Sequence, residues 1–178
     1  MLKNTSLAIL FVLAFCNLSL AQQAGSSAAI PRAQAQCRIS DEEAITVDYF
    51  SPAMKGRRIF GGLVPYGKAW RTGDEPATFV TDEDLVALKG TNIPAGSYTI
   101  AIVPHPDNWT LIVRKNTIYE SDELTRVPMS VKKLPAPVEN FTISFDQGAG
   151  SCTMRVSWEN TQASLEFAIR NSDLPLRP

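Results

Sequence analysis

Apolar and polar residues alternate along most of this chain, and this alternation restricts the fold more than any other feature. In residues 152–158 every second side chain is apolar, and the same period recurs in residues 45–49, 97–103 and 141–145. A period of two is typical of strands with one buried face. Turn-forming clusters separate the runs, and a helical period is almost absent. The pattern predicts an all-β domain, an antiparallel β-sandwich or flattened barrel of roughly nine or ten short strands with little helix.

The first 21 residues are typical of an export signal. Lys3 supplies a positive charge, residues 7–18 are apolar, and small residues precede a cleavage point after Ala21. The apolar run is shorter than the roughly 20 residues of a membrane-spanning helix, which favours cleavage over a retained anchor. Lipidation at Cys16 is the alternative, although the preceding Phe15 is larger than the small residue that lipoprotein signals carry there. We expect an exported protein, periplasmic or extracellular.

Composition divides the rest of the chain into three parts. Residues 22–36 are rich in Ala, Gln and Ser and predict a flexible linker. Residues 37–170 form the single β-sandwich domain, and residues 171–178 a C-terminal tail. Without Lys3 the chain has 16 basic and 18 acidic side chains, a net charge of −2. This charge gives no indication of nucleic acid or an anionic membrane as a partner, and no later apolar run is long enough to span a bilayer.

Two cysteines, Cys37 and Cys152, remain after cleavage. An even number of cysteines in an exported chain favours a disulfide. Cys152 shares the apolar face of its strand with Met154 and Val156, and Cys37 is in phase with Ile39. The alternation therefore places both cysteines in the core and predicts a bond between them; two buried free thiols are the alternative.

Residues 51–78 (SPAMKGRRIFGGLVPYGKAWRTGDEPAT) are too rich in Gly and Pro for a helix and too long for a hairpin turn. A long loop in a compact domain is usually functional or disordered, and its aromatic residues Phe60, Tyr66 and Trp70 argue against disorder. The loop holds five basic residues before its first acid, Asp74. The basic residues are Lys55, Arg57, Arg58, Lys68 and Arg71. The candidate ligand-binding residues are Arg71, Tyr66, Trp70, Lys55, Arg57 and Glu75.

Arg71 has two interpretations. Its guanidinium is suited to carboxylate, phosphate or sugar oxygens and stacks on aromatic rings, so Arg71 could contact a ligand. It could instead be a buried strut that holds the loop down through Asp48, Asp74 or Glu75.

No catalytic, metal or cofactor residues are predicted. His105 is the only histidine and lies between two prolines in a turn, where no orienting group is apparent. The acids of residues 82–84 lack the spacing of a calcium loop. Asp74 and Glu75 are adjacent, so their side chains tend to diverge, and the acid pair of a glycan hydrolase would need one of them beside a distant acid such as Asp48. No glycine-rich phosphate loop opens a helix.

The chain resembles a bacterial family known as domain of unknown function 2911. The resemblance covers roughly residues 37–169 and rests most on the K-G-R-x-I-F-G and W-R-T-G blocks within residues 51–73. Further matching segments are Asp48-Tyr49, PAGSYT (94–99), WTLI (109–112) and PVENFTISFD (137–146). The family usually has Asn-Glu-Ala after W-R-T-G, whereas this chain has Asp74-Glu75-Pro76-Ala77. The resemblance implies an exported β-rich domain and no particular activity.

These observations favour a non-enzymatic binding module of the bacterial cell envelope, with a glycan or polypeptide as ligand. One alternative is an envelope hydrolase that uses Asp or Glu together with Arg71. Another is a structural or assembly module that pairs with a partner through an exposed sheet edge.

Overall fold

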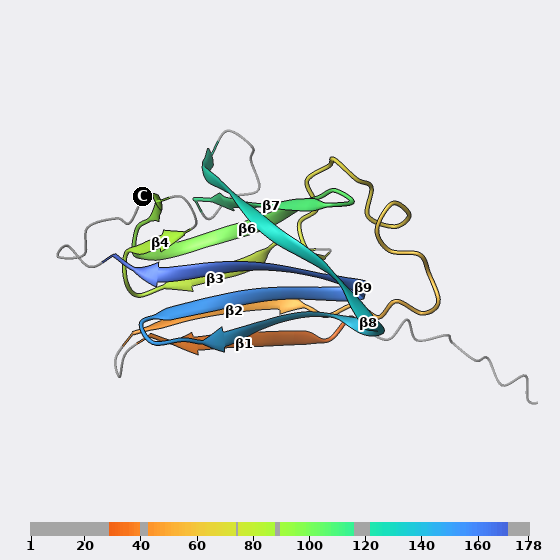
Figure 1. Cartoon of the computed structure of the whole chain (residues 1–178), viewed down its shortest axis with the longest axis horizontal. Helices are drawn as coiled ribbons and strands as arrows, with labels where there is room; N and C mark the ends of the chain where they lie inside the picture. Colours follow the sequence, from red (N-terminus) through yellow and green to blue (C-terminus); the bar gives the residue numbers. More distant parts are fainter. Residues whose placement is uncertain (1–28, 40–42, 74, 88–89, 116–121, 171–178) are drawn as a thin grey trace, which may run out of the picture.

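The computed structural model describes residues 29–39, 43–73, 75–87, 90–115 and 122–170. The predictions of a signal peptide and a C-terminal tail lie outside these residues. The described strands are β1 (Arg32–Arg38), β2 (Ala44–Phe50), β3 (Ala77–Thr81), β4 (Leu85–Ala87), β5 (Thr91–Ile93), β6 (Gly96–Pro104), β7 (Asn108–Arg114), β8 (Glu123–Gln147) and β9 (Ser151–Ile169). They form one antiparallel sheet in the order β1-β2-β3-β6-β7-β8-β9-β4-β5 (Figure 1). The predicted all-β class is confirmed.

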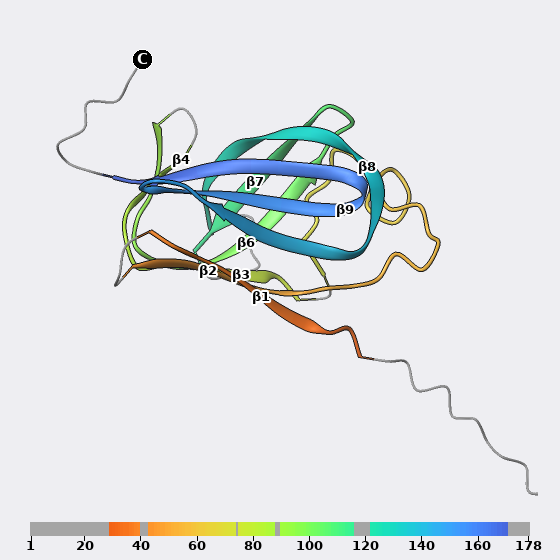
Figure 2. The same cartoon turned by 60° about the horizontal axis from the view of Figure 1, so that its bottom comes forward.

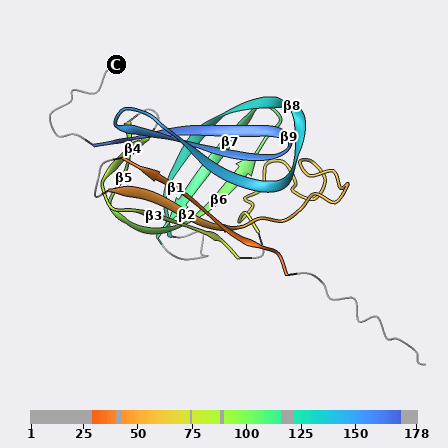
Figure 3. The same cartoon turned by 90° about the horizontal axis from the view of Figure 1, so that it is seen from below.

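The sheet folds over on itself, so that the long β8–β9 hairpin lies across β1, β2 and β3 (Figures 2 and 3). Contacts between the two layers define the core. The Tyr49 hydroxyl on β2 donates a hydrogen bond to the Ile143 carbonyl on β8 over 3.2 Å. Phe79 on β3 meets Phe167 on β9, with ring centroids 5.5 Å apart. This is the packing of a β-sandwich.

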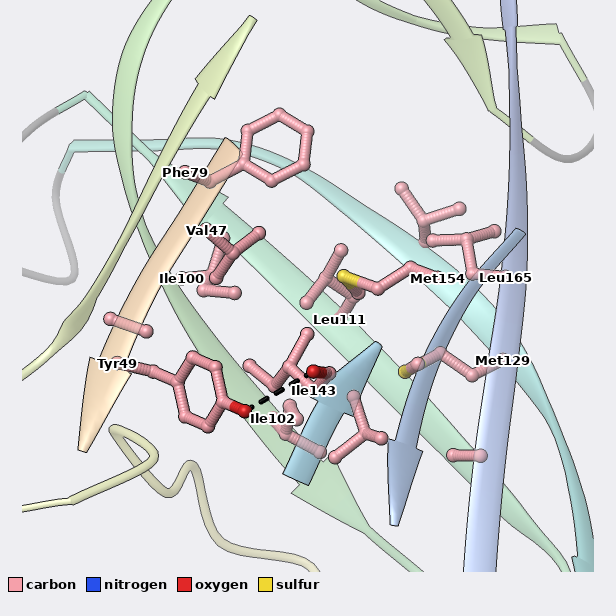
Figure 4. Close-up of a cluster of buried hydrophobic side chains, with 14 of the residues drawn as sticks. Val47, Tyr49, Phe79, Ile100, Ile102, Leu111, Met129, Ile143, Met154 and Leu165 are labelled. Carbon is pink, nitrogen blue, oxygen red and sulfur yellow. Dashed lines mark hydrogen bonds between the residues drawn. The ribbon is translucent and has the colours of Figure 1, made fainter. Parts of the chain in front are cut away.

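The core is built from the alternating residues that the sequence pattern indicates. On β2, Ile45, Val47 and Tyr49 are buried, whereas Asp48 is exposed. Met154 on β9 is fully buried and faces the same interior (Figure 4). Burying one large aliphatic or aromatic side chain contributes roughly 1.5–3 kcal/mol. A slip of one residue would turn the apolar face of a strand toward solvent, so this burial fixes the pairing register of the strands.

The last third of the chain differs from its prediction. The sequence pattern predicts only short strands, but β8 is 25 residues long and β9 is 19. The pairing register shifts between Lys133 and Val138 and again before Thr142, and Glu159 has a φ of 52°. Residues such as Pro137 and Asn160 indicate that regular strand pairing is interrupted, but they do not indicate whether the chain turns back or only bends. Here the chain only bends.

The predicted linker is wrong from Arg32 onward, because β1 begins there and pairs with β2. Only Ala35 and Cys37 of β1 are buried. The strand is held instead by its backbone ladder and by cross-strand bonds, such as that from Gln34 Nε2 to Asp48 Oδ1 over 2.9 Å. The composition of a segment indicates how much apolar surface it can bury. An edge strand needs to bury little apolar surface, so composition alone did not reveal β1.

The predicted disulfide is confirmed. Cys37 on β1 is bonded to Cys152 on β9, across 115 residues of sequence, and both residues are buried. The bond joins the edge strand of one layer to the hairpin of the other. Among the described residues, no helix is long and apolar enough to cross a bilayer.

Candidate functional site

The segment 51–76 between β2 and β3, here called the β2–β3 loop, projects from one end of the sandwich (Figures 1 and 2). Backbone hydrogen bonds tie it down on two sides. Met54 N donates to the Glu139 carbonyl over 2.7 Å, which attaches the start of the loop to β8. Gly67 N donates to the Pro104 carbonyl over 2.9 Å, and Trp70 exchanges two 2.8 Å bonds with Ile102, which attaches its end to β6. The loop therefore has a fixed path despite its lack of regular structure.

Two of its three aromatic residues anchor the loop to the core. Phe60 is buried and packs on Trp109, with ring centroids 4.6 Å apart. Trp70 is half-buried and stacks on Trp158 at 5.5 Å, with an interplanar angle of 20°. It also meets the edge of Phe141 at 4.9 Å. Trp70, a candidate ligand contact, is thus placed as a support beneath the loop.

A tight turn at residues 58–64 lies in the middle of the loop. Leu63 N bonds to the Arg58 carbonyl and Val64 N to the Ile59 carbonyl, over 3.1 and 2.9 Å. Ile59 and Val64 point inward and are buried, whereas Leu63 is 50% exposed. Gly61 has a φ of 77°, and a Cβ there would lie 2.7 Å from the ring of Tyr66. Glycine is required at this position both for its conformation and to seat the tyrosine.

Leu63 and Tyr66 are the only large apolar side chains that are exposed among the residues the structure describes, at 50% and 36%. They lie three residues apart in the loop, and we call this exposed pair the tip. Single apolar side chains are often exposed on folded proteins. What distinguishes this pair is that it lies in the same loop as five exposed cations.

All five cationic side chains of the loop are exposed, and none forms an ion pair with an acid that the structure describes. These are Lys55, Arg57, Arg58, Lys68 and Arg71. Arg57 donates only to the carbonyls of Ala53 and Met54, over 2.8 and 3.0 Å. By contrast, three arginines outside the loop bond to carboxylates: Arg32 to Glu75, Arg126 to Glu123 and Arg155 to Asp146. The loop concentrates positive charge that the rest of the described chain does not neutralise.

The strut interpretation of Arg71 finds no support. The side chain is exposed, and its two described candidate partners are engaged elsewhere. Asp48 accepts a hydrogen bond from Gln34, and Glu75 pairs with Arg32 over 3.0 Å. The third candidate, Asp74, lies outside the described residues. Glu75 is therefore placed with Arg32 rather than with the exposed cations.

Backbone strain lies next to Arg71. Thr72 is fully buried with a φ of 65°, which is rare for a β-branched residue. Its hydroxyl donates to the Arg71 carbonyl over 2.5 Å and accepts from Ala77 N over 3.3 Å. Such a conformation costs about 1–3 kcal/mol and persists only where the surroundings enforce it. These bonds hold the backbone on the C-terminal side of Arg71.

Two acids, one on β8 and one on β9, contact the backbone of the loop. Glu139 accepts the backbone N–H of Lys55 over 2.8 Å, and Glu159 that of Phe60 over 3.4 Å. Both carboxylates thus help to hold the loop. His105 and Asp107 are exposed in the neighbouring β6–β7 turn.

The opposite end of the sandwich is acidic. The Asp82 carboxylate accepts a hydrogen bond from the backbone N–H of Ala44, the first residue of β2. The β2–β3 loop follows the last residue of β2, Phe50. Glu43, Glu83 and Asp84 adjoin Asp82 in sequence or in space, and a hydrogen bond and the negative charge of Glu43 raise the pKa of Glu83 above its ordinary value. The seven residues of β2 separate the two ends by roughly 20 Å.

Tyr66, Lys55, Arg57 and Arg71 are each exposed on the loop, whereas Trp70 packs beneath it and Glu75 pairs with Arg32. Sequence reasoning did not select Leu63, because Ile59, Leu63 and Val64 are equally apolar. No group of three or more His, Cys, Asp or Glu side chains suited to a metal ion occurs in the part of the chain that the structure describes.

Comparison with known proteins gives one match. The model of a family described as "Protein of unknown function (DUF2911)" matches residues 30–167. No curated protein and no solved structure shows a significant match to the chain. The match covers the whole sandwich and the β2–β3 loop. The chain therefore belongs to the DUF2911 family.

Proposed function

We propose that this domain is a non-enzymatic binding module of the cell envelope, and that it holds an anionic ligand on the exposed side of the β2–β3 loop. One observation carries the proposal: five exposed cations gather on an anchored loop without an acidic partner among the described residues. Like charges repel, so their assembly opposes folding unless a ligand supplies the opposite charge. The anchoring holds the cations in place before the ligand arrives, which lowers the entropic cost of binding.

Two alternatives have less support. A hydrolase would need Arg71 beside free acids, but Asp48 and Glu75 are bonded to Gln34 and Arg32. An assembly module would use β1 or β5, the two ends of the strand order, and no observation favours those edges over the loop.

The proposal is tested by binding of the exported protein to soluble anionic polymers, dextran sulfate and polyglutamate, with neutral dextran as reference. In the loop variant, three exposed cations are changed to Gln: Lys55, Lys68 and Arg71. Their side chains make no hydrogen bond to a described residue. The control variant makes the same change of charge at exposed cations elsewhere: Lys115, Lys132 and Arg170.

We expect the loop variant to lose about tenfold to a hundredfold in affinity, since an exposed ionic contact is worth roughly 0.5–1 kcal/mol. The control variant should bind like the wild type. Equal losses in the two variants would mean that only net charge matters and would refute a site on the loop.

A further inference from the structure

We infer that the anionic partner is a bilayer surface rich in acidic lipids, into which Leu63 and Tyr66 insert while the surrounding cations meet the lipid phosphates. This inference rests on the proposed function and names the partner. It requires three properties of the loop: an exposed apolar tip, cations around the tip, and a rigid connection to the domain.

The tip combines two kinds of side chain that suit a bilayer. Leu63 can enter the hydrocarbon boundary, and tyrosine is enriched where lipid headgroups meet it. A soluble acidic glycan would make use of Tyr66 and of the arginines, but it offers no apolar surface to a leucine on a projecting turn. The combination therefore favours a lipid surface over a soluble polymer.

The cations lie within the same short segment as the tip. The side chains of Arg58 and Tyr66 both lie beside Gly61. A Cβ atom added to Gly61 would lie 3.4 Å from the Arg58 guanidinium and 2.7 Å from the Tyr66 ring. Lys68 follows Tyr66 by two residues. Basic residues close to apolar anchors are the usual arrangement of proteins that bind acidic membranes.

Net charge conceals this arrangement. Outside the loop's five cations the full chain has 12 Lys and Arg against 18 Asp and Glu. The acidic end at Asp82 and Glu83 lies roughly 20 Å from the loop, beyond a Debye length of about 8 Å at physiological salt. An acidic surface therefore attracts the loop end and experiences little repulsion from the other end. Several described acids reduce this attraction: Asp107 in the turn beside the loop, Glu75 within the loop, and Glu139 and Glu159 against its backbone.

The rigid connection comes from the residues beneath the tip. Ile59, Phe60 and Val64 are buried, so that the turn which carries Leu63 is fixed to the core. An apolar side chain held outward in advance inserts without a large ordering cost.

The test is co-sedimentation of the exported protein with vesicles of phosphatidylcholine that contain 30 mol% phosphatidylglycerol, with vesicles of phosphatidylcholine alone as reference. We expect binding to the acidic vesicles only. Changing Lys55, Lys68 and Arg71 to Gln should weaken it about a hundredfold, because each cation near an acidic surface contributes about fivefold. Leu63→Ser should weaken it about tenfold, as burial of a leucine side chain implies.

Insertion itself is read from an environment-sensitive fluorophore on a cysteine. Leu63→Cys places the probe at the tip, and Asn92→Cys places it at an exposed site on β5 as control. The probe at position 63 should shift to the blue with acidic vesicles, and the probe at position 92 should not.

The outcomes separate the two proposals. Loop-dependent binding to dextran sulfate without binding to vesicles would overturn the lipid assignment and leave the proposed function standing. Binding to neither probe would refute both. Vesicle binding that is insensitive to Leu63→Ser, with no shift at position 63, would overturn insertion.

Discussion

Reduction of the Cys37–Cys152 bond should cost a large part of the domain's stability. The bond spans 115 residues of sequence. In the chain-entropy treatment, opening a loop of this length frees about 16 cal/mol/K in the unfolded chain, or about 4.8 kcal/mol at 25 °C. Measured effects are usually about 2–4 kcal/mol, because the unfolded chain keeps some structure. Since β1 buries only Ala35 and Cys37, little other packing compensates within that strand.

The assay is guanidinium unfolding of the protein, with and without reductant, followed by tryptophan fluorescence. The signal should report on the fold because Trp70 and Trp158 stack on each other. We expect the free energy of unfolding to fall by about 2–5 kcal/mol on reduction. The variant with both Cys37 and Cys152 changed to Ala should be insensitive to reductant. A loss below about 1 kcal/mol in the wild type, or two reactive thiols per unfolded, unreduced chain, would refute the reasoning.

Three further predictions concern single side chains. Arg71→Ala and Arg71→Lys should leave the melting temperature within a few degrees, because the side chain is exposed and has no described acidic partner; a large loss in both would restore the strut interpretation. Phe60→Ala should cost about 3–5 kcal/mol by chemical denaturation, whereas the neighbouring Leu63→Ala should change the free energy of unfolding by about 0.5 kcal/mol or less. Glu83→Gln should raise stability at neutral pH. The hydrogen bond to Glu43 and its charge raise the pKa of Glu83 in the fold, so the native state gains stability from protonation of Glu83 at low pH and loses it as pH rises through that pKa. Thermal melts between pH 3 and 8 should show the advantage of the variant shrink toward low pH, and an advantage independent of pH would contradict this account.

The sequence predicted the core because each core strand lies between two different environments. Ile45, Val47 and Tyr49 alternate with polar residues since one face of β2 meets the other layer and one meets solvent. The same logic placed Cys37 and Cys152 inward, which was enough to pair them. Alternation records burial directly, so any strand that lies between core and water can be predicted in this way.

Features that depend on tertiary pairing escaped prediction. Residues 32–36 became a strand because β2 offered an unpaired edge, a property of β2 that their own composition does not contain. Likewise, Leu63 and Val64 are adjacent apolar residues on one turn, yet one is half exposed and the other buried. Which of the two faces the core depends on how the loop is anchored to β6 and β8. The loop was therefore predictable as a candidate site, whereas the exposure of Leu63 was not.

The construction of the β2–β3 loop argues for a binding role more strongly than its composition does. Thr72 is held at a positive φ, as is Lys55, and each costs about 1–3 kcal/mol that a relaxed loop would avoid. Five like charges are collected where a neutral loop would fold more easily. At the same time Phe60 and Trp70 fix the loop against Trp109 and Trp158. A connection that served only to join β2 to β3 could be short and unstrained. One segment thus combines strain, firm anchoring and five cations that pair with no described acid, and a preformed surface for an anionic partner requires these properties.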